Sequence, residues 1–140
     1  MAVLLNPYLS FDGIAEEVLN FYKSIFGGEV TLSRFGDTPG MPVTAEQKDL
    51  IMHGDLVSPH VRLMVSDAMT EEAAKSGGNI SLSLSGDDDA TLSAFFSDLS
   101  EGGTVREPLV TAPWGDKFGM VTDRYGVNWM FNIGTSTLPA

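Results

Sequence analysis

An order of elements that is written twice constrains this chain more than any other feature. The first half predicts a strand, a helix that ends at Gly27-Gly28, and three further strands, at residues 3–11, 14–26, 29–35, 50–57 and 61–65. The second half predicts the same order, with a helix that ends at Gly102-Gly103 and elements at residues 79–85, 86–101, 104–109, 118–122 and 127–133. Because one such unit leaves a sheet edge and half a core uncovered, two units are expected to fold together.

Each predicted helix carries an apolar stripe at three- and four-residue spacing. The stripes consist of Ala15, Val18, Leu19, Tyr22 and Phe26 in the first helix, and of Leu92, Phe95, Phe96 and Leu99 in the second. Asp12 is expected to cap the first helix, and the acidic run of residues 86–89 is expected to cap the second, where negative charge is favoured.

The strands alternate, and this predicts which side chains share a face. In the second half Ile80, Leu82 and Leu84 are expected to be buried, so that the intervening serines face the other way. The segments HVRLMVS and GVNWMFN align between the halves and place Met64 opposite Met130 in the repeat. Trp129 alternates with Met130, and it is therefore expected to pack in the core under the second helix.

These patterns predict the α+β class, as a single domain of residues 1–140. It would contain two tandem βαβββ modules (residues 3–67 and 79–134) joined by a linker (residues 68–78). The two sheets are expected to form a partly closed mixed-sheet barrel, with helices outside and a cleft inside. The connection at residues 36–48 is long enough to serve as a lid or binding segment.

Charge and composition exclude several classes of function. The chain has 8 Lys and Arg against 19 Asp and Glu, a net charge of -11, which argues against binding nucleic acid or anionic membranes. It has no cysteine, which excludes disulfides, thiolate nucleophiles and cysteine–zinc sites. The sequence has no apolar run of the roughly 18 residues that a membrane span needs and no basic region typical of a secretory signal, so a cytoplasmic protein is expected.

Three stretches carry a resemblance to a known family: NPYLSFDG with FYKSIFGG, MHGDL, and WGDKFGMVTDRYGVNWMFNI. With the repeat, they resemble the vicinal oxygen chelate superfamily of glyoxalase I, bleomycin-resistance proteins, fosfomycin-resistance enzymes and extradiol dioxygenases. The closest likeness is to the PhnB-like branch, sometimes labelled demethylubiquinone-methyltransferase-like. The sequence does not support a methyltransferase, because no glycine-rich loop follows a strand and opens a helix. The resemblance implies a glyoxalase-like fold and a homodimer.

The resemblance also implies a divalent metal held by two His or Gln and one or two Glu, which chelates substrate oxygens as a Lewis acid. Carried onto this chain, the carboxylate positions fall at Met64 and Met130, and a thioether is a poor ligand for these metals. The remaining ligand positions fall at Tyr8 or Asn6 and at Asn79 or Ser81. We therefore expect no metal and no cofactor, and a cleft floor that is partly apolar.

His53 is the catalytic candidate, because an imidazole can act as a base or bind an anion when protonated. The alternative is a half-buried histidine bonded to the backbone. His60 follows the turn at Ser58-Pro59 and is expected to be exposed. The predicted ligand-binding residues are Tyr8, Ser10, Arg62, Ser81, Ser83, Trp114, Asn128, Met130 and Asn132.

Two of these residues have open alternatives. Arg62 shares a face with Met64 and would anchor a carboxylate or phosphate if it points inward, or it is a solvated charge at the strand edge. Trp114 either stacks on a flat ligand or packs against the second sheet. The serines have no recognisable base, so a serine nucleophile is not supported.

Two functions follow from these observations, and they leave open whether the chain is an enzyme. The first is a small-molecule binding protein of glyoxalase-like fold that lacks the usual metal ligands, with its ligand unknown. The alternative is a metal-dependent lyase, transferase or dioxygenase with non-standard ligands, among them His53. Under either reading a homodimer is expected, since open sheet edges give a reason for chains to pair.

Overall fold

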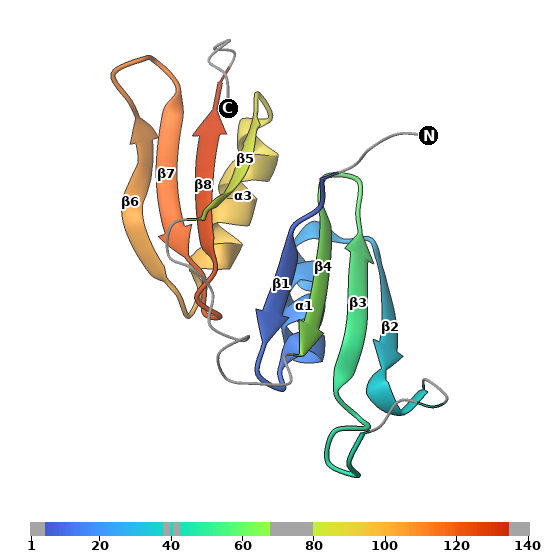
Figure 1. Cartoon of the computed structure of the whole chain (residues 1–140). Helices are drawn as coiled ribbons and strands as arrows, with labels where there is room; N and C mark the ends of the chain where they lie inside the picture. Colours follow the sequence, from blue (N-terminus) through green and yellow to red (C-terminus); the bar gives the residue numbers. More distant parts are fainter. Residues whose placement is uncertain (1–4, 38–39, 41–42, 68–79, 135–140) are drawn as a thin grey trace. The chain divides into compact units, whose positions relative to one another are not determined.

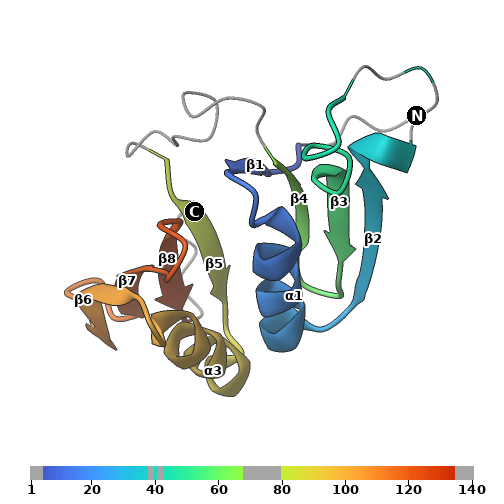
Figure 2. The ribbon, with the colours of Figure 1, turned by 90° about the horizontal axis from the view of Figure 1, so that it is seen from below.

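The structure is a computed structural model that describes residues 5–37, 40, 43–67 and 80–134. The chain divides into two compact units, residues 1–76 and 77–140. Each unit has one four-stranded sheet with one helix lying on one of its faces, as Figure 1 and Figure 2 show. The predicted linker at residues 68–78 lies outside the described residues.

In the part that the structure describes, unit 1 contains one α-helix, one short 3-10 helix and four strands. In chain order these are β1 (Tyr8–Phe11), α1 (Ala15–Phe26), β2 (Glu29–Arg34), the short 3-10 helix η1 (Phe35–Asp37), β3 (Ile51–Val57) and β4 (Arg62–Asp67). The strand order in the sheet is β1-β4-β3-β2, with β1 parallel to β4 and the other pairs antiparallel.

Unit 2 repeats this topology. Its elements are β5 (Leu82–Gly86), α3 (Asp89–Ser100), β6 (Thr104–Thr111), β7 (Lys117–Thr122) and β8 (Asn128–Ile133). The strand order is β5-β8-β7-β6, again with the first strand parallel and the others antiparallel. The expected α+β class and the tandem βαβββ order are therefore confirmed. The packing of the two sheets into one barrel-like domain stays a prediction.

The core of each unit lies between its helix and its sheet. All of the predicted stripe residues of α1 and α3 are buried, from Ala15 to Phe26 and from Leu92 to Leu99. In unit 2, Trp129 is 2% exposed and its Nε1 donates to Asp123 Oδ2 at 2.9 Å, so its predicted place in the core is confirmed.

The starts of the first strand of each unit differ most from the sequence expectation. Within the described residues the first strand begins at Tyr8, because Pro7 before it has no N–H to donate to a ladder. The carbonyl oxygen of Pro7 accepts a hydrogen bond from Met64 N at 3.0 Å. Residues 3 and 4 lie outside the described part. In the second half Ile80 was expected to be buried, but it precedes β5 and is 67% exposed.

The expected cap of the first helix is also wrong. The N-cap residue of α1 is Ile14, whose side chain forms no capping hydrogen bond. Instead Asp67, at the end of β4, accepts from Ala15 N at 2.9 Å and from Ile51 N at 2.9 Å. In α3 the expected acidic cap is confirmed, because Asp88 accepts from Thr91 N at 3.1 Å.

Among the described residues, no helix is long and apolar enough to cross a membrane. The cytoplasmic location stays a prediction.

Candidate functional site

Each sheet has a face turned away from its helix, which we call the helix-distal face. In β4, Leu63 and Val65 are buried toward α1, and Met64 between them is half-buried on the helix-distal face. In β8, Trp129 is buried toward α3, and Met130 next to it is half-buried on the helix-distal face. The two methionines thus occupy matching positions in the two units, as the repeat predicts.

On the helix-distal face of unit 1, Tyr8 and His53 form a side-chain pair. The Tyr8 hydroxyl lies 2.9 Å from His53 Nδ1, and the two ring centroids are 5.5 Å apart. Either the hydroxyl or the imidazole N–H donates, depending on the histidine tautomer. Among residues that the structure describes, His53 Nε2 has no hydrogen-bond partner. The predicted alternative of a histidine bonded to the backbone is therefore replaced by a pair with one free ring nitrogen.

Arg62 lies on the same face and is engaged by an acid. Its Nη2 donates to Asp55 Oδ2 at 3.0 Å, and its Nε lies 3.4 Å from Asp55 Oδ1. The hydrogen bond to Asp55, with the attraction of its charge, raises the pKa of the Arg62 guanidinium. Because Asp55 occupies these donors, a ligand anion would have to compete with an acid that is always present.

Ser10 is half-buried in β1, where it pairs in register with Ser66 of β4. Tyr8 pairs with Met64 in the same ladder. Tyr8, Ser10 and Met64 therefore come together on one face, as expected from the alternation.

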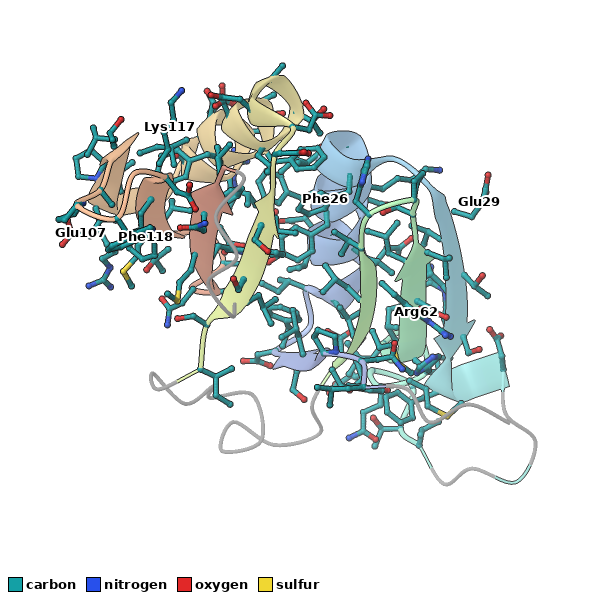
Figure 3. The ribbon with its side chains drawn as sticks, turned by 90° about the horizontal axis from the view of Figure 1, so that it is seen from above. Phe26, Glu29, Arg62, Glu107, Lys117 and Phe118 are labelled. Carbon is teal, nitrogen blue, oxygen red and sulfur yellow. The ribbon has the colours of Figure 1, made fainter. Side chains whose placement is uncertain are left out.

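The helix-distal face of unit 2 contains a hollow of about 500 Å³. It is lined by Ser81, Arg106, Glu107, Met120, Val121, Thr122, Asn128 and Trp129. Figure 3 shows Glu107 and Phe118 on the side of the sheet away from α3, whereas Lys117 points to the side of α3. The predicted residues Ser81 and Asn128 thus lie in one hollow, together with residues that the sequence did not single out.

A chain of hydrogen bonds crosses this hollow. Arg106 Nε donates to Thr122 Oγ1 at 3.0 Å, and Thr122 Oγ1 donates to Asn128 Oδ1 at 2.8 Å. Asn128 Nδ2 in turn lies 3.4 Å from the carbonyl oxygen of Ile80. Side chains of three strands are therefore linked to one another and to the backbone of the segment before β5.

Arg106 was missed because its position depends on an irregularity. The register of β6 on β7 shifts between Val105 and Glu107, so Arg106 is the extra residue of a bulge. Bulges re-aim side chains, and strict alternation gives no sign of them. Met120 could have been found, because the turn at residues 123–126 places it opposite Met130 in the ladder. Ser83 pairs with Met130 on the other side.

Trp114 and Asn132 form a second polar group in unit 2. Trp114 Nε1 donates to Asn132 Oδ1 at 3.0 Å, and Asn132 Nδ2 donates to the buried Asp116 Oδ2 at 3.0 Å. Trp114 also contacts Phe118 edge-on, with 5.5 Å between ring centroids, and 46% of its surface stays exposed. It therefore packs against the sheet of its own unit, and stacking on a flat ligand stays a prediction.

The family model of the Glyoxalase/Bleomycin resistance protein/Dioxygenase superfamily matches residues 4–131. The chain belongs to this superfamily. Over 139 residues it is 29% identical to Protein YjdN of Escherichia coli (strain K12), covering 92% of this chain and 94% of that protein. The expected superfamily is thereby confirmed.

Solved structures of the superfamily fold agree with this assignment. Protein PA1353 from Pseudomonas aeruginosa is 37% identical with a TM-score of 0.83, covering 96% of this chain and 100% of that one. The PhnB protein from Bacillus cereus is 25% identical with a TM-score of 0.75, covering 94% of this chain and 100% of that one. The expected likeness to PhnB proteins is confirmed.

The donor atoms on the helix-distal faces do not fit the divalent metal that the superfamily resemblance implies. The two positions at which the resemblance places carboxylates hold the thioethers of Met64 and Met130, which bind hard or borderline ions poorly. The neighbouring donors are mostly hydroxyls and amides, such as Tyr8, Ser83 and Asn128. Within the described ranges, no three His, Cys, Asp or Glu side chains group closely enough to hold a metal ion.

Proposed function

We propose that this chain is a small-molecule binding protein that uses the helix-distal faces of its glyoxalase-like sheets without the metal of its superfamily. The observation that carries the proposal is the matching pair Met64 and Met130, which stand half-buried on these faces where acids would hold a metal. Thioethers make an apolar and adaptable surface, which suits an organic ligand better than an ion.

The polar groups around the methionines support a binding role. Small-molecule sites are mostly apolar with a few fixed hydrogen-bonding groups. In unit 1 these groups are the Tyr8–His53 pair and Ser10, and in unit 2 they are Ser83, Asn128 and Asn132. Asn128 and Asn132 are each held by neighbouring side chains, so their orientation is fixed before a ligand arrives.

A thermal-shift screen tests this proposal. The protein is first treated with EDTA and then mixed with small aromatic and anionic compounds. Because a ligand that binds only the folded state stabilises it by about 2.7 kcal/mol at a hundred times its Kd, binders raise the Tm. Stabilisation that appears only after a divalent metal is added would contradict the proposal, as would a screen without any hit.

A pair of variants locates the binding on the helix-distal face. Met130→Lys places a charge on that face and is expected to abolish the Tm increase caused by a compound that binds there. Ser97→Lys is the matched control, because Ser97 is exposed on α3, on the other side of the sheet. Equal responses of both variants to the compound would place the binding elsewhere.

The proposal includes a homodimer. The edge strand β6 is exposed along almost its whole length, with Val105 and Val110 about half exposed. An open edge strand of this length is a surface on which a second chain can pair or pack. Sedimentation velocity is expected to give the mass of two chains, and a mass of one chain at micromolar concentration would contradict the dimer.

A further inference from the structure

We propose that the hollow around Arg106 binds the carboxylate group of a small organic acid whose apolar part lies against Met120. The inference rests on the proposed binding function and names the class of ligand and the side chain that anchors it. It replaces Arg62, which the sequence offered as the anion anchor and which Asp55 already engages.

The guanidinium of Arg106 is held at Nε, and its two terminal nitrogens can bind a ligand. Its Nε donates to Thr122 Oγ1, and its two terminal nitrogens have no partner among the residues that the structure describes. A guanidinium fixed at Nε presents the two terminal N–H groups as a planar fork, which matches the two oxygens of a carboxylate.

The other arginines are used by the protein itself. Arg34 donates to Glu16 and to the carbonyl of Asp49, and Arg62 donates to Asp55. Arg124 donates twice to the carbonyl oxygen of Glu101. Arg106 alone contacts only a hydroxyl, so no acid among the described residues forms an ion pair with it.

The surroundings favour a single negative charge over a double one. Glu107 lines the same hollow next to Arg106, and the whole chain carries a net charge of -11. A phosphate monoester with two charges would be repelled by both, whereas a carboxylate brings one charge to one guanidinium. Met120 then provides the apolar contact for the rest of the ligand.

Thr122 is a positioning residue for this site. Its hydroxyl accepts from Arg106 and donates to Asn128, so both of its hydrogen-bonding functions are directed within the hollow. Valine at this position keeps the shape and loses both bonds, which releases the guanidinium.

Titration of the 140-residue chain, followed by ¹⁵N NMR, tests the inference with three probes that share a phenyl ring. Benzoate is the carboxylate, benzamide is its uncharged counterpart, and phenyl phosphate carries the dianion. Benzoate is expected to shift the backbone signals of Arg106, Met120 and Asn128 and to bind more tightly than the other two. Tighter binding of phenyl phosphate or equal binding of benzamide would overturn the carboxylate assignment.

Variants then test the anchor. Arg106→Gln is expected to weaken benzoate binding about tenfold or more, because a charged hydrogen-bonded pair is lost. Arg124→Gln removes the same charge from the same unit and is expected to leave the Kd for benzoate unchanged. Thr122→Val is expected to weaken binding and Thr122→Ser to restore it, with the folded spectrum of each variant as the check on structure.

The results separate this inference from the proposed function. Benzoate binding that survives Arg106→Gln, or a protein that ignores benzoate but is stabilised by neutral compounds in the screen, overturns the Arg106 site and leaves the binding function standing. If neither benzoate nor any compound in the screen binds, both fail.

Discussion

Asp67 is a buried carboxylate that joins three segments of unit 1. It is 3% exposed, and its two oxygens accept from the first turn of α1 and from the start of β3. A carboxylate is acceptor-only when ionised, so its two oxygens suit two N–H donors in a buried position. The residue therefore ties the end of β4 to the helix and to the neighbouring strand.

Asp67→Asn is expected to lower the free energy of unfolding by about 1–3 kcal/mol, because an amide NH₂ then faces a backbone N–H and leaves it unsatisfied. Urea denaturation measures the loss. Asp12→Asn is the control, since Asp12 is exposed and does not cap α1. A loss for Asp67→Asn that is no larger than the loss for Asp12→Asn would contradict this role of Asp67.

Asp89 at the start of α3 contacts Lys117 of β7. The hydrogen bond from Lys117 and, next, the one from Ser93 hold the pKa of Asp89 below its ordinary value. Because the folded pKa is lowered, this contact stabilises the protein above the pKa of the unfolded chain, and the contribution is lost as the pH falls through the folded pKa.

Lys117→Met is expected to move the pKa of Asp89 upward, toward its ordinary value. The titration of the Asp89 carboxyl carbon, followed by NMR, measures the change. Ser93→Ala is expected to produce a smaller upward change, since its hydrogen bond is the second cause. An unchanged titration in Lys117→Met would mean that the ion pair does not persist in solution.

At the scale of elements, a glycine in an inner strand of each sheet leaves room for side chains of the helix that covers the sheet. A Cβ on Gly119 of β7 would lie 2.9 Å from Phe96 Cε2 and 3.0 Å from Leu109 Cα. A Cβ on Gly54 of β3 would lie 2.8 Å from Val65 Cγ2 and 3.1 Å from Leu19 Cδ2. Gly119 pairs with Phe131 and Gly54 pairs with Val65, and these two partners occupy matching positions in the repeat.

Gly119→Ala is expected to destabilise the protein by about 1–3 kcal/mol, as overpacking in a core does. Gly54→Ala is expected to cost less, because its contacts are the ends of side chains, whereas Leu109 contributes backbone. Urea denaturation of both variants gives the order. The reverse order, or a stabilised Gly119→Ala, would contradict the close packing at β7.

The helices could be predicted from the sequence because their buried residues recur every three to four positions, and this spacing is visible in the apolar residues. The stripe from Leu92 to Leu99 and its Asp88 cap needed only local rules. The cap of α1 could not be predicted, since Asp67 is 52 residues from Ala15 in the chain. Arg106 was missed because a bulge breaks the alternation that assigns side chains to faces.

At the scale of the whole molecule, the internal repeat predicted the topology of both units and the matching faces of Met64 and Met130. It could not predict which polar groups meet. The Tyr8–His53 pair joins side chains of the non-consecutive strands β1 and β3, and the Arg106–Thr122–Asn128 chain starts from the bulge of β6. Their partners are set by sheet register, which the sequence does not specify to within one residue.

Methyl NMR of the methionines tests the central claim most directly, because Met64, Met120 and Met130 lie on the helix-distal faces. The spectra are recorded on EDTA-treated protein with the compounds that raise its Tm. The account predicts shifts of the Met64, Met120 or Met130 signals without added metal. Unmoved signals of all three methionines, or shifts that require a divalent ion, would contradict it.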